Sequence, residues 1–442
     1  MRFFDRVSET AELRRIRELS MRASRFTVLT GRRRVGKTEL IHHALGDQPY
    51  IYWYVTRSVE KVQVSTFQDS AEEVLGIRLP ARVESFTALF AWVMEQAALR
   101  PVTLVIDEFQ EFSRINPGIF SEMAAVWDRL HKAARINLVV SGSIDRLMNM
   151  IFFDDGEPLY GRNTGKIRLM PFRISVLKEI LSAYAPRGTF KAEDLLTLWT
   201  LTGGVARYVE QLMDEGAVTA QGMLESALRH SSPILDEGKV VLIQEFGKDY
   251  GTYFSILAAV ANGRTSYGEI KNELGVEPGA YLDKLEREYG VLERKVPFNG
   301  SPRGKNGQYK IEDRFFRFWF RFIYKYQYLV ESGRYRELLA IVTRDFPTYS
   351  GESLESYFRA LFLERENYTR IGGWWDRKGE NEIDLVAENE LERRLDFFEV
   401  KRDARDIRLP ALDRKTGAYF EKNGTCGDGW TIRCQGLSLE DM

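Results

Sequence analysis

Cysteine and histidine are scarce in this sequence. Two cysteines, Cys426 and Cys434, and four histidines occur among 442 residues. A disulfide framework and a zinc module built from cysteine and histidine ligands are therefore both excluded. Such sparing use of cysteine fits a protein of the reducing cytosol.

An excess of charge of either sign is also missing. The 63 basic and 64 acidic residues give a formal net charge of −1, so no global field attracts nucleic acid. Any binding to nucleic acid would have to come from local patches of charge.

Long uninterrupted apolar runs are absent as well. The N-terminal segment MRFFDRVSE lacks the apolar core of a signal peptide. The most apolar long stretch, residues 315–330, is interrupted by Arg317, Arg321 and Lys325 and is too polar to cross a bilayer. We therefore expect a cytoplasmic protein that does not associate with membranes. With 44% hydrophobic and 29% charged residues it can form ordinary globular cores, and its length suggests about three domains.

What the sequence does contain is a phosphate-binding loop. An apolar strand runs into a complete G-x-x-x-x-G-K-[ST] motif, which opens a helix. The motif predicts backbone N–H groups turned toward a phosphate at a helix N-terminus, whose dipole favours an anion. Lys37 would reach the β- and γ-phosphates of ATP, and the Thr38 hydroxyl would bind Mg²⁺. The predicted nucleotide contacts are Gly31, Arg32, Arg33, Arg34, Val35, Gly36, Lys37 and Thr38.

Polar residues end two further apolar strands. Residues 101–106 lead into Asp107, which would hold Mg²⁺, and Glu108, which would polarise the attacking water. Residues 136–140 lead into Ser141 and Ser143, either of which would contact the γ-phosphate or orient water; capping the next helix is the alternative. The alternation of strands and helices predicts an α/β fold, with a parallel sheet covered on both faces and its ligand at the C-terminal ends of the strands.

These motifs together resemble a known family. The phosphate loop with its arginine run, DEFQ and VSGS at strand ends, PLYGR and GGV look like the prokaryotic AAA-like ATPases of the STAND-related group. The resemblance implies that Arg162 is an arginine finger at a γ-phosphate, in cis or from a neighbouring subunit of a homo-oligomer. The alternative is a surface arginine that pairs with Asp154, Asp155 or Glu157.

Residues 172–228 are helical by their period and would form a lid over the nucleotide, and we assign the lid to residues 171–236. In the segment GGVARY this chain has Ala206 where the family usually has a proline that approaches the nucleotide. Arg207, the next residue, could serve as a second phosphate sensor.

Residues 237–312 follow the pattern of a winged helix. Helices are predicted over 253–261, 266–274 and 278–288, and Ser266 and Glu269 are spaced as a capping box. Two strands and the wing loop between them, residues 299–307, complete the motif. Arg303 and Lys305 of that loop would contact DNA phosphates, but the third helix has no net positive face. A spacer between domains is therefore the alternative.

Aromatic residues recur at helical spacing in residues 315–330, together with three basic residues. This stripe could bind nucleic acid. A helix that packs two domains together is the favoured interpretation.

The last part of the chain carries a second pattern of charged residues. Asp384 lies on one predicted strand, and Glu399 and Lys401 lie on one face of the next, which resembles the core of restriction-endonuclease-like nucleases (PD-(D/E)xK). Asp384 and Glu399 would bind Mg²⁺, with Glu355 completing the metal shell from a helix. Lys401 would activate a water or hold a phosphate oxygen. The alternative is a pair of ordinary amphipathic strands.

The sequence therefore predicts an ATPase core (1–170), a helical lid (171–236), a winged helix (237–312) and a nuclease-like α/β domain (313–442). We expect an enzyme that binds and hydrolyses ATP, with Mg²⁺ as cofactor, and whose nucleotide state controls the C-terminal domain, with DNA as a possible partner. The alternative is a regulatory or assembly switch whose C-terminal module binds without cleaving.

Overall fold

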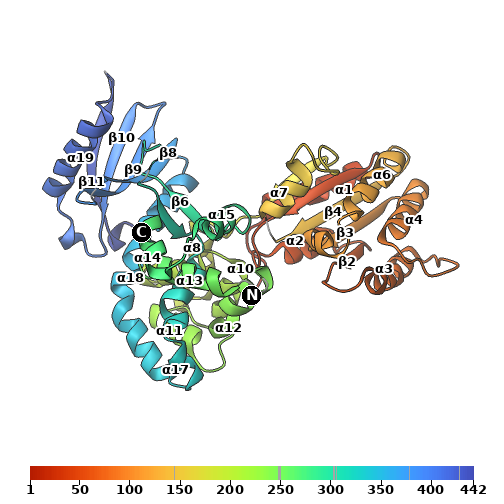
Figure 1. Ribbon diagram of the computed structural model, residues 1–442, viewed down its shortest axis with the longest axis horizontal. Helices are drawn as coiled ribbons and strands as arrows, with labels where there is room; N and C mark the ends of the chain where they lie inside the picture. Colours follow the sequence, from red (N-terminus) through yellow and green to blue (C-terminus); the bar gives the residue numbers. More distant parts are fainter. Residues whose placement is uncertain (144, 247–249, 302–303, 305, 378, 428) are drawn as a thin grey trace. The chain divides into compact units, whose positions relative to one another are not determined.

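The chain forms two compact units in the computed structural model, which describes residues 1–143, 145–246, 250–301, 304, 306–377, 379–427 and 429–442. One unit consists of residues 5–171, and the other of residues 1–4 together with 172–442 (Figure 1). The finer boundaries predicted at residues 236 and 312 fall inside the second unit and stay predictions.

A parallel sheet forms the centre of the N-terminal unit. Its strands lie in the order β2-β3-β4-β1-β5, and all neighbours pair in parallel. They are β1 (Arg25–Thr30), β2 (Ile51–Tyr54), β3 (Val102–Asp107), β4 (Ile136–Gly142) and β5 (Gly165–Arg168). The side chains of β1, β3 and β4 are almost all buried, which explains their unbroken apolar runs. The predicted α/β fold with a parallel sheet is confirmed.

Helices cover both faces of this sheet. α1 packs against α2 on one face, whereas α4 packs against α3 and α6, and the apolar residues of these three share one core with the sheet. Trp53, Phe86 and Phe90 are fully buried in that core. The helices are α1 (Val7–Ser20), α2 (Lys37–Leu45), α3 (Glu60–Leu75), α4 (Phe86–Leu99), η1 (Phe109–Glu111), α5 (Phe112–Ile115), α6 (Ile119–Leu130) and α7 (Asp145–Phe153).

The C-terminal unit begins with helices, as the periodicity of residues 172–228 predicted. Their buried leucines share one hydrophobic core with the helices that follow. These first helices are α8 (Ile174–Tyr184), η2 (Pro186–Gly188), α9 (Ala192–Thr202), α10 (Ala206–Asp214), α11 (Ala220–Leu228) and α12 (Ile234–Phe246).

The helices and strands expected of a winged helix follow in order. The capping box forms at the second helix: Ser266 Oγ accepts from the Glu269 N–H at 3.3 Å, and the Glu269 carboxylate accepts from the Ser266 N–H at 2.9 Å. The elements are α13 (Tyr250–Ala261), α14 (Tyr267–Leu274), α15 (Gly279–Arg287), β6 (Leu292–Lys295) and β7 (Gln308–Ile311). Arg303 and Lys305, predicted to contact DNA, lie outside the described residues.

The aromatic segment is not the single helix that its spacing predicted. It consists of α16 (Arg314–Phe318), a π-helical stretch η4 (Trp319–Tyr324) and α17 (Gln327–Glu331). Trp319 is buried, its indole N–H donates to the Leu235 carbonyl at 2.9 Å, and its ring lies against Gly238, where a Cβ would approach within 2.3 Å. The wider π turn accompanies this packing. The phenylalanines of residues 315–330 are buried, as expected of a segment that packs against other parts of the chain.

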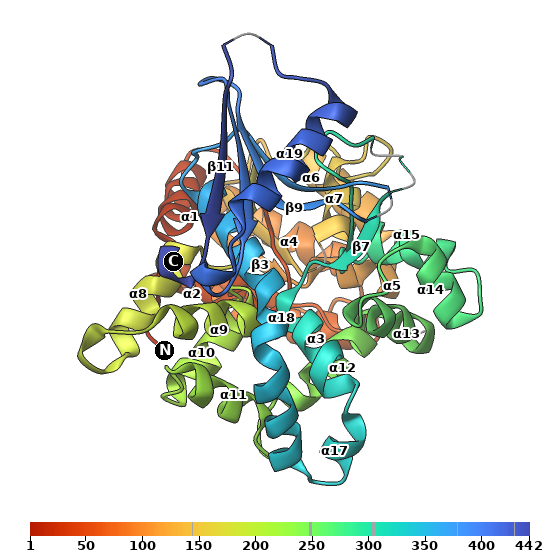
Figure 2. The same cartoon turned by 90° about the vertical axis from the view of Figure 1, so that its left-hand side faces the viewer.

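A long helix leads into a mixed sheet at the end of the chain. α18 (Tyr335–Glu364) runs from α17 to the sheet (Figure 2). The sheet has the order β11-β10-β9-β8, in which β10 and β11 are parallel and the other neighbours antiparallel. Its elements are β8 (Arg370–Trp375), β9 (Glu382–Asn389), β10 (Arg394–Val400), η5 (Ala404–Asp406), α19 (Leu409–Asn423), β11 (Thr431–Leu437) and η6 (Leu439–Asp441). Of the helices in the described residues, none has the length and apolar character that a membrane span requires.

Candidate functional sites

The phosphate loop connects β1 to α2, as the motif predicted. Gly31 directly follows β1, and a Cβ at this position would lie 2.5 Å from the Leu169 carbonyl oxygen, so only glycine fits. Gly36 has a φ of 99°, in the left-handed region that favours glycine. Val35 anchors the loop, because its side chain is buried and its carbonyl oxygen accepts from Arg6 at 3.4 Å. The two glycines and Val35 thus define the path of the backbone.

Lys37 is the first residue of α2 and folds back onto the loop. Its ammonium group donates to the carbonyl oxygens of Gly31 at 2.8 Å and Arg32 at 3.3 Å. The side chains of Arg32, Arg33 and Arg34 are half-buried in the same loop. Three consecutive arginines, together with Lys37, therefore place four positive charges in or beside one loop.

Asp107 is the centre of the hydrogen bonds at the end of β3. Its buried carboxylate accepts from the Thr38 hydroxyl at 3.0 Å, from the Tyr52 hydroxyl at 2.6 Å, from its neighbour's N–H at 2.9 Å and from Ser141. The structure thus brings together Thr38, Asp107 and Ser141, which the sequence predicted from three separate motifs. Since these donors are uncharged, they orient the carboxylate without neutralising it.

Glu108 lies beside this group in a left-handed conformation, with φ of 54°. Its carboxylate accepts from the Ser143 hydroxyl at 2.8 Å and from the Gln110 amide. Ser143 was one of the two serines predicted at the end of β4, and here it positions Glu108. A non-glycine residue in this conformation carries strain, which is often found at functional sites.

Sequence reasoning missed Tyr52. It lies on β2, next to β3 in the sheet, and its hydroxyl reaches Asp107. Burial and, after it, the negative charge of Asp107 raise the pKa of the Tyr52 phenol far above its ordinary value. The aromatic strand was visible in the sequence, but only the order of the strands shows which tyrosine faces the carboxylate.

Arg162 lies near the N-terminal end of β1, whereas the phosphate loop follows the C-terminal end of the same strand. It precedes β5, and Thr164 accepts from the Phe26 N–H at 2.9 Å near the start of β1. The parallel strand from Phe26 to the loop spans about 16 Å. The Arg162 guanidinium donates to the Asp128 carboxylate at 2.6 and 3.0 Å, and not to Asp154, Asp155 or Glu157, which the sequence suggested as partners. Arg162 therefore lies away from the phosphate loop of its own chain.

Arg207 belongs to the C-terminal unit. It lies in the first turn of α10, is exposed, and pairs with Glu210 at 3.1 Å. Its role as a phosphate sensor stays a prediction.

A second group of charged residues gathers where β9 and β10 separate. The ladder ends at the pair Leu385–Phe398, and beyond it the Asp384 carboxylate accepts from the Val400 N–H at 2.7 Å. Lys401 donates to the same carboxylate at 3.1 Å and lies 3.9 Å from Glu399. The structure therefore brings Asp384, Glu399 and Lys401 together, and we call these three residues the carboxylate–lysine site.

Cations and backbone donors surround this site. Glu399 is buried, accepts from the Arg408 N–H at 2.7 Å and has Lys415 at 3.9 Å. Burial lowers the pKa of Lys401, but the neighbouring carboxylates, Asp384 first, outweigh burial and leave that pKa raised. Lys401 is therefore firmly charged.

Glu355, on α18, borders this site. Burial, followed by the negative charges of Asp384 and Glu352, raises the pKa of Glu355 to about 8. Among the described residues, no three histidine, cysteine or acidic side chains are placed to hold a metal ion. Glu355, Asp384 and Glu399 are thus not gathered as a three-ligand group in this arrangement, and their role as metal ligands stays a prediction.

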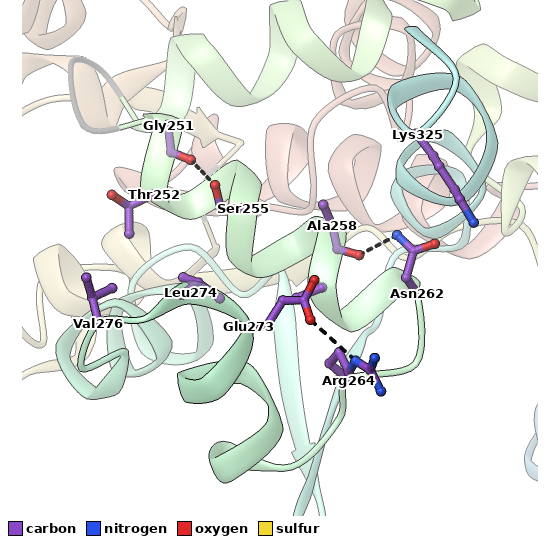
Figure 3. Close-up of a pocket in the computed structure, with 11 residues that line it drawn as sticks. Gly251, Thr252, Ser255, Ala258, Asn262, Arg264, Glu273, Leu274, Val276 and Lys325 are labelled. Atoms are coloured by element: carbon purple, nitrogen blue, oxygen red, sulfur yellow. Dashed lines mark hydrogen bonds and ion pairs between the residues drawn. The ribbon is translucent and has the colours of Figure 1, made fainter.

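A separate polar pocket of about 730 Å³ lies along α13 (Figure 3). Small side chains such as Ser255 and Ala258 form one wall, and an ion pair between Arg264 and Glu273 at 3.5 Å lies in it. Lys325 adds an exposed cation. Lys325 belongs to the aromatic and basic stripe of residues 315–330.

The parallel sheet, the loop and the acidic strand end define residues 5–171 as a P-loop ATPase domain. Residues 3–212 match a family described as an ATPase domain predominantly from Archaea. Residues 319–409 match a family described as Archaea bacterial proteins of unknown function. MJECL04 of Methanocaldococcus jannaschii, an uncharacterized protein, is 28% identical over 414 residues, which cover 91% of this chain and 88% of that protein.

Two solved structures share the fold. The Walker-type ATPase PABY2304 of Pyrococcus abyssi gives a TM-score of 0.54 at 21% identity, covering 72% of this chain and 96% of that one. The ORC2 protein of Aeropyrum pernix, solved in ADPNP–ADP complexes, gives 0.51 at 14% identity, covering 74% and 94%. Together the comparisons support an ATP-binding ATPase.

Proposed function

We propose that this protein binds ATP with Mg²⁺ at the phosphate loop, hydrolyses it, and uses its nucleotide state to control nucleic-acid binding at the carboxylate–lysine site. The observation that carries the proposal is the contact between Thr38 and Asp107 at the mouth of that loop. A hydroxyl and a carboxylate are the hard oxygen donors that Mg²⁺ prefers, and its remaining ligands would come from phosphates and water. When bound, the cation would offset charge on the phosphates.

Each side chain has a role in this proposal. Lys37 would exchange its two loop carbonyls for phosphate oxygens, which bear full charge. Glu108, oriented by Ser143, would polarise the attacking water. Ser141 and Tyr52 would hold Asp107 in place.

Arg162 enters the proposal only through a second copy of the chain. Its position near the N-terminal end of β1, away from the phosphate loop, favours an arginine finger supplied in trans over one in cis. Mixing a Lys37→Ala protein with an Arg162→Ala protein tests this idea, because a site that joins the intact loop of the Arg162→Ala chain to the intact arginine of the Lys37→Ala chain would be complete. No recovery of ATP hydrolysis on mixing would count against it.

A second candidate function is a switch whose C-terminal module binds but does not cleave. The ion pair between Lys401 and Asp384 favours this candidate, since it neutralises a carboxylate that a metal-dependent nuclease would offer to a cation. ATP would then change the assembly of the protein or its grip on nucleic acid.

The test combines two assays on the purified full chain. Phosphate release from ATP with Mg²⁺ should fall at least about 100-fold in Lys37→Ala, but not in Lys61→Ala, an exposed lysine of the same unit. Plasmid cleavage with Mg²⁺ or Mn²⁺, with and without ATP, is then compared in Asp384→Ala and Lys401→Ala, with Glu421→Ala and Lys422→Ala as exposed controls on α19. Hydrolysis unchanged in Lys37→Ala would refute the site. If the wild type cleaves the plasmid and both site variants do not, the result selects the nuclease. If the wild type does not cleave, the result selects the switch.

A further inference from the structure

The wing does not project freely from the C-terminal unit. The Phe298 N–H donates to the Gly373 carbonyl at 2.7 Å, and the Trp375 indole donates to the Asn306 carbonyl at 3.0 Å. The Asn299 amide also donates to the Tyr419 hydroxyl at 2.7 Å. Phe298, Asn299 and Asn306 therefore lie against β8, the edge strand of the sheet, and against α19.

Helix α18 presents a polar stripe on the side of the wing. Glu352, Glu355 and Arg359 follow at helical spacing and are half-buried, whereas Leu354 and Phe358 point into the core. Lys310 of β7 lies 3.2 Å from the Glu352 carboxylate, and Arg317 of α16 pairs with the same group. Ion pairs to Glu352 therefore join the polar stripe of α18 to the wing strand β7 and to α16.

Cations outnumber carboxylates in this region. Lys295 of β6 is within electrostatic range of Arg359, Lys310 and Arg314, and burial together with these like charges lowers its pKa. We call Lys295, Lys310, Arg314, Arg317 and Arg359 the wing cluster. The carboxylates that face it are Glu293, Glu352 and Glu355. Ion pairs with Glu293 and Glu352 offset part of this positive charge, and an anion bound among the cations would offset the rest.

The wing cluster also adjoins the carboxylate–lysine site. Glu355 lies within electrostatic range of Lys310 on one side and of Asp384 on the other. By contrast, α15, the usual groove helix of a winged helix, has its Lys284 and Arg287 balanced by acidic neighbours, including Asp283 at 2.7 Å from Arg287. Positive charge is therefore more concentrated at the base of the wing than on α15.

We propose that the wing cluster binds the phosphodiester backbone of nucleic acid and leads it to the carboxylate–lysine site. Lys295 and Lys310 would contact phosphates, while Arg314 and Arg317 would support them from α16. Phosphate contacts of this kind fix position and register without reading sequence. The inference rests on the proposed nucleic-acid function of the C-terminal unit and assigns its binding surface.

The test measures binding in EDTA, so that cleavage and ATP hydrolysis play no part. Fluorescence anisotropy of labelled 20-mers of duplex DNA, single-stranded DNA and duplex RNA is recorded against salt for the full chain. Lys295→Gln/Lys310→Gln should bind roughly tenfold more weakly per lysine lost, and the slope of log K against log salt should fall by about 0.9 per lysine. Lys284→Gln/Arg287→Gln on α15 and Lys325→Gln in the α13 pocket should bind like the wild type.

A charge-preserving variant, Lys295→Arg/Lys310→Arg, separates lost contacts from lost folding, since it should retain binding; thermal unfolding of all variants is compared in parallel. If the wild type binds a probe and Lys295→Gln/Lys310→Gln binds it equally well, the inference is overturned and the proposed function stands. The same holds if only the α15 changes weaken binding. Wild type that binds none of the three probes would overturn both the inference and the nucleic-acid part of the proposed function, with ATP hydrolysis unaffected. The three probes show which nucleic acid is the partner.

Discussion

The two candidate sites hold their carboxylates in opposite ways. At the phosphate loop, Asp107 accepts hydrogen bonds from hydroxyls and a backbone N–H, all uncharged. At the carboxylate–lysine site, Asp384 is held by the ammonium of Lys401. Uncharged donors leave a full negative charge for a cation, whereas a lysine already neutralises it. In our proposal the first site therefore takes Mg²⁺ with a nucleotide, and the second takes a phosphate next to Lys401.

Removing the charge at the first site should have the largest effect. In Asp107→Asn the hydrogen bonds to Tyr52 and Ser141 persist in part, but the negative charge is gone. We expect Mg²⁺-dependent ATP hydrolysis to fall at least about 100-fold, with nucleotide affinity in EDTA nearly unchanged. Steady-state hydrolysis and binding of a fluorescent ATP analogue measure the two effects. Equal losses in both would mean that Asp107 is structural.

Removing the cation at the second site should make it resemble the first. In Lys401→Met the carboxylates of Asp384 and Glu399 lose their counter-charge, so Mn²⁺ should bind there about tenfold more tightly. Electron paramagnetic resonance of free Mn²⁺, in an Asp107→Asn background without nucleotide, isolates this site. Lys422→Met is the matched control. If Lys401→Met left Mn²⁺ affinity unchanged, the contrast between the two sites would be lost.

The smallest effect concerns a single hydrogen bond to Asp107. Tyr52→Phe removes one uncharged donor and keeps the ring, so ATP hydrolysis should fall about fivefold, corresponding to ~1 kcal/mol. Tyr54→Phe, on the same strand and exposed, should leave the rate unchanged. A loss of 100-fold in Tyr52→Phe would instead make the tyrosine part of the chemistry.

How far the sequence could predict this structure depended on how local the signal is. The phosphate loop, Asp107 and Ser141 were found because each lies in or beside a short motif that ends a buried strand. Tyr52 was missed because its contact with Asp107 depends on which strands are neighbours. Asp128 was missed as the partner of Arg162 because it lies on α6, 34 residues earlier in the chain, and only the fold brings the two together.

The C-terminal unit shows the same limit on a larger scale. The sequence placed Glu355 on a helix, and that helix, α18, continues through Pro347, with α9 and α11 packed along it. Conversely, an unbroken helical spacing predicted one helix where the burial of Trp319 accompanies a π turn. Packing between distant segments decided both outcomes, and a single sequence does not reveal it.

The central claim is that nucleotide bound at the phosphate loop controls the C-terminal site. Its most direct test measures the affinity of the full chain for labelled DNA with Mg²⁺ and a slowly hydrolysed ATP analogue, with ADP, and without nucleotide, in wild type and Lys37→Ala. We predict that affinity changes at least about fivefold between the nucleotide states of the wild type, about 1 kcal/mol of coupling, and not at all in Lys37→Ala. The same affinity in every state of the wild type would contradict the account.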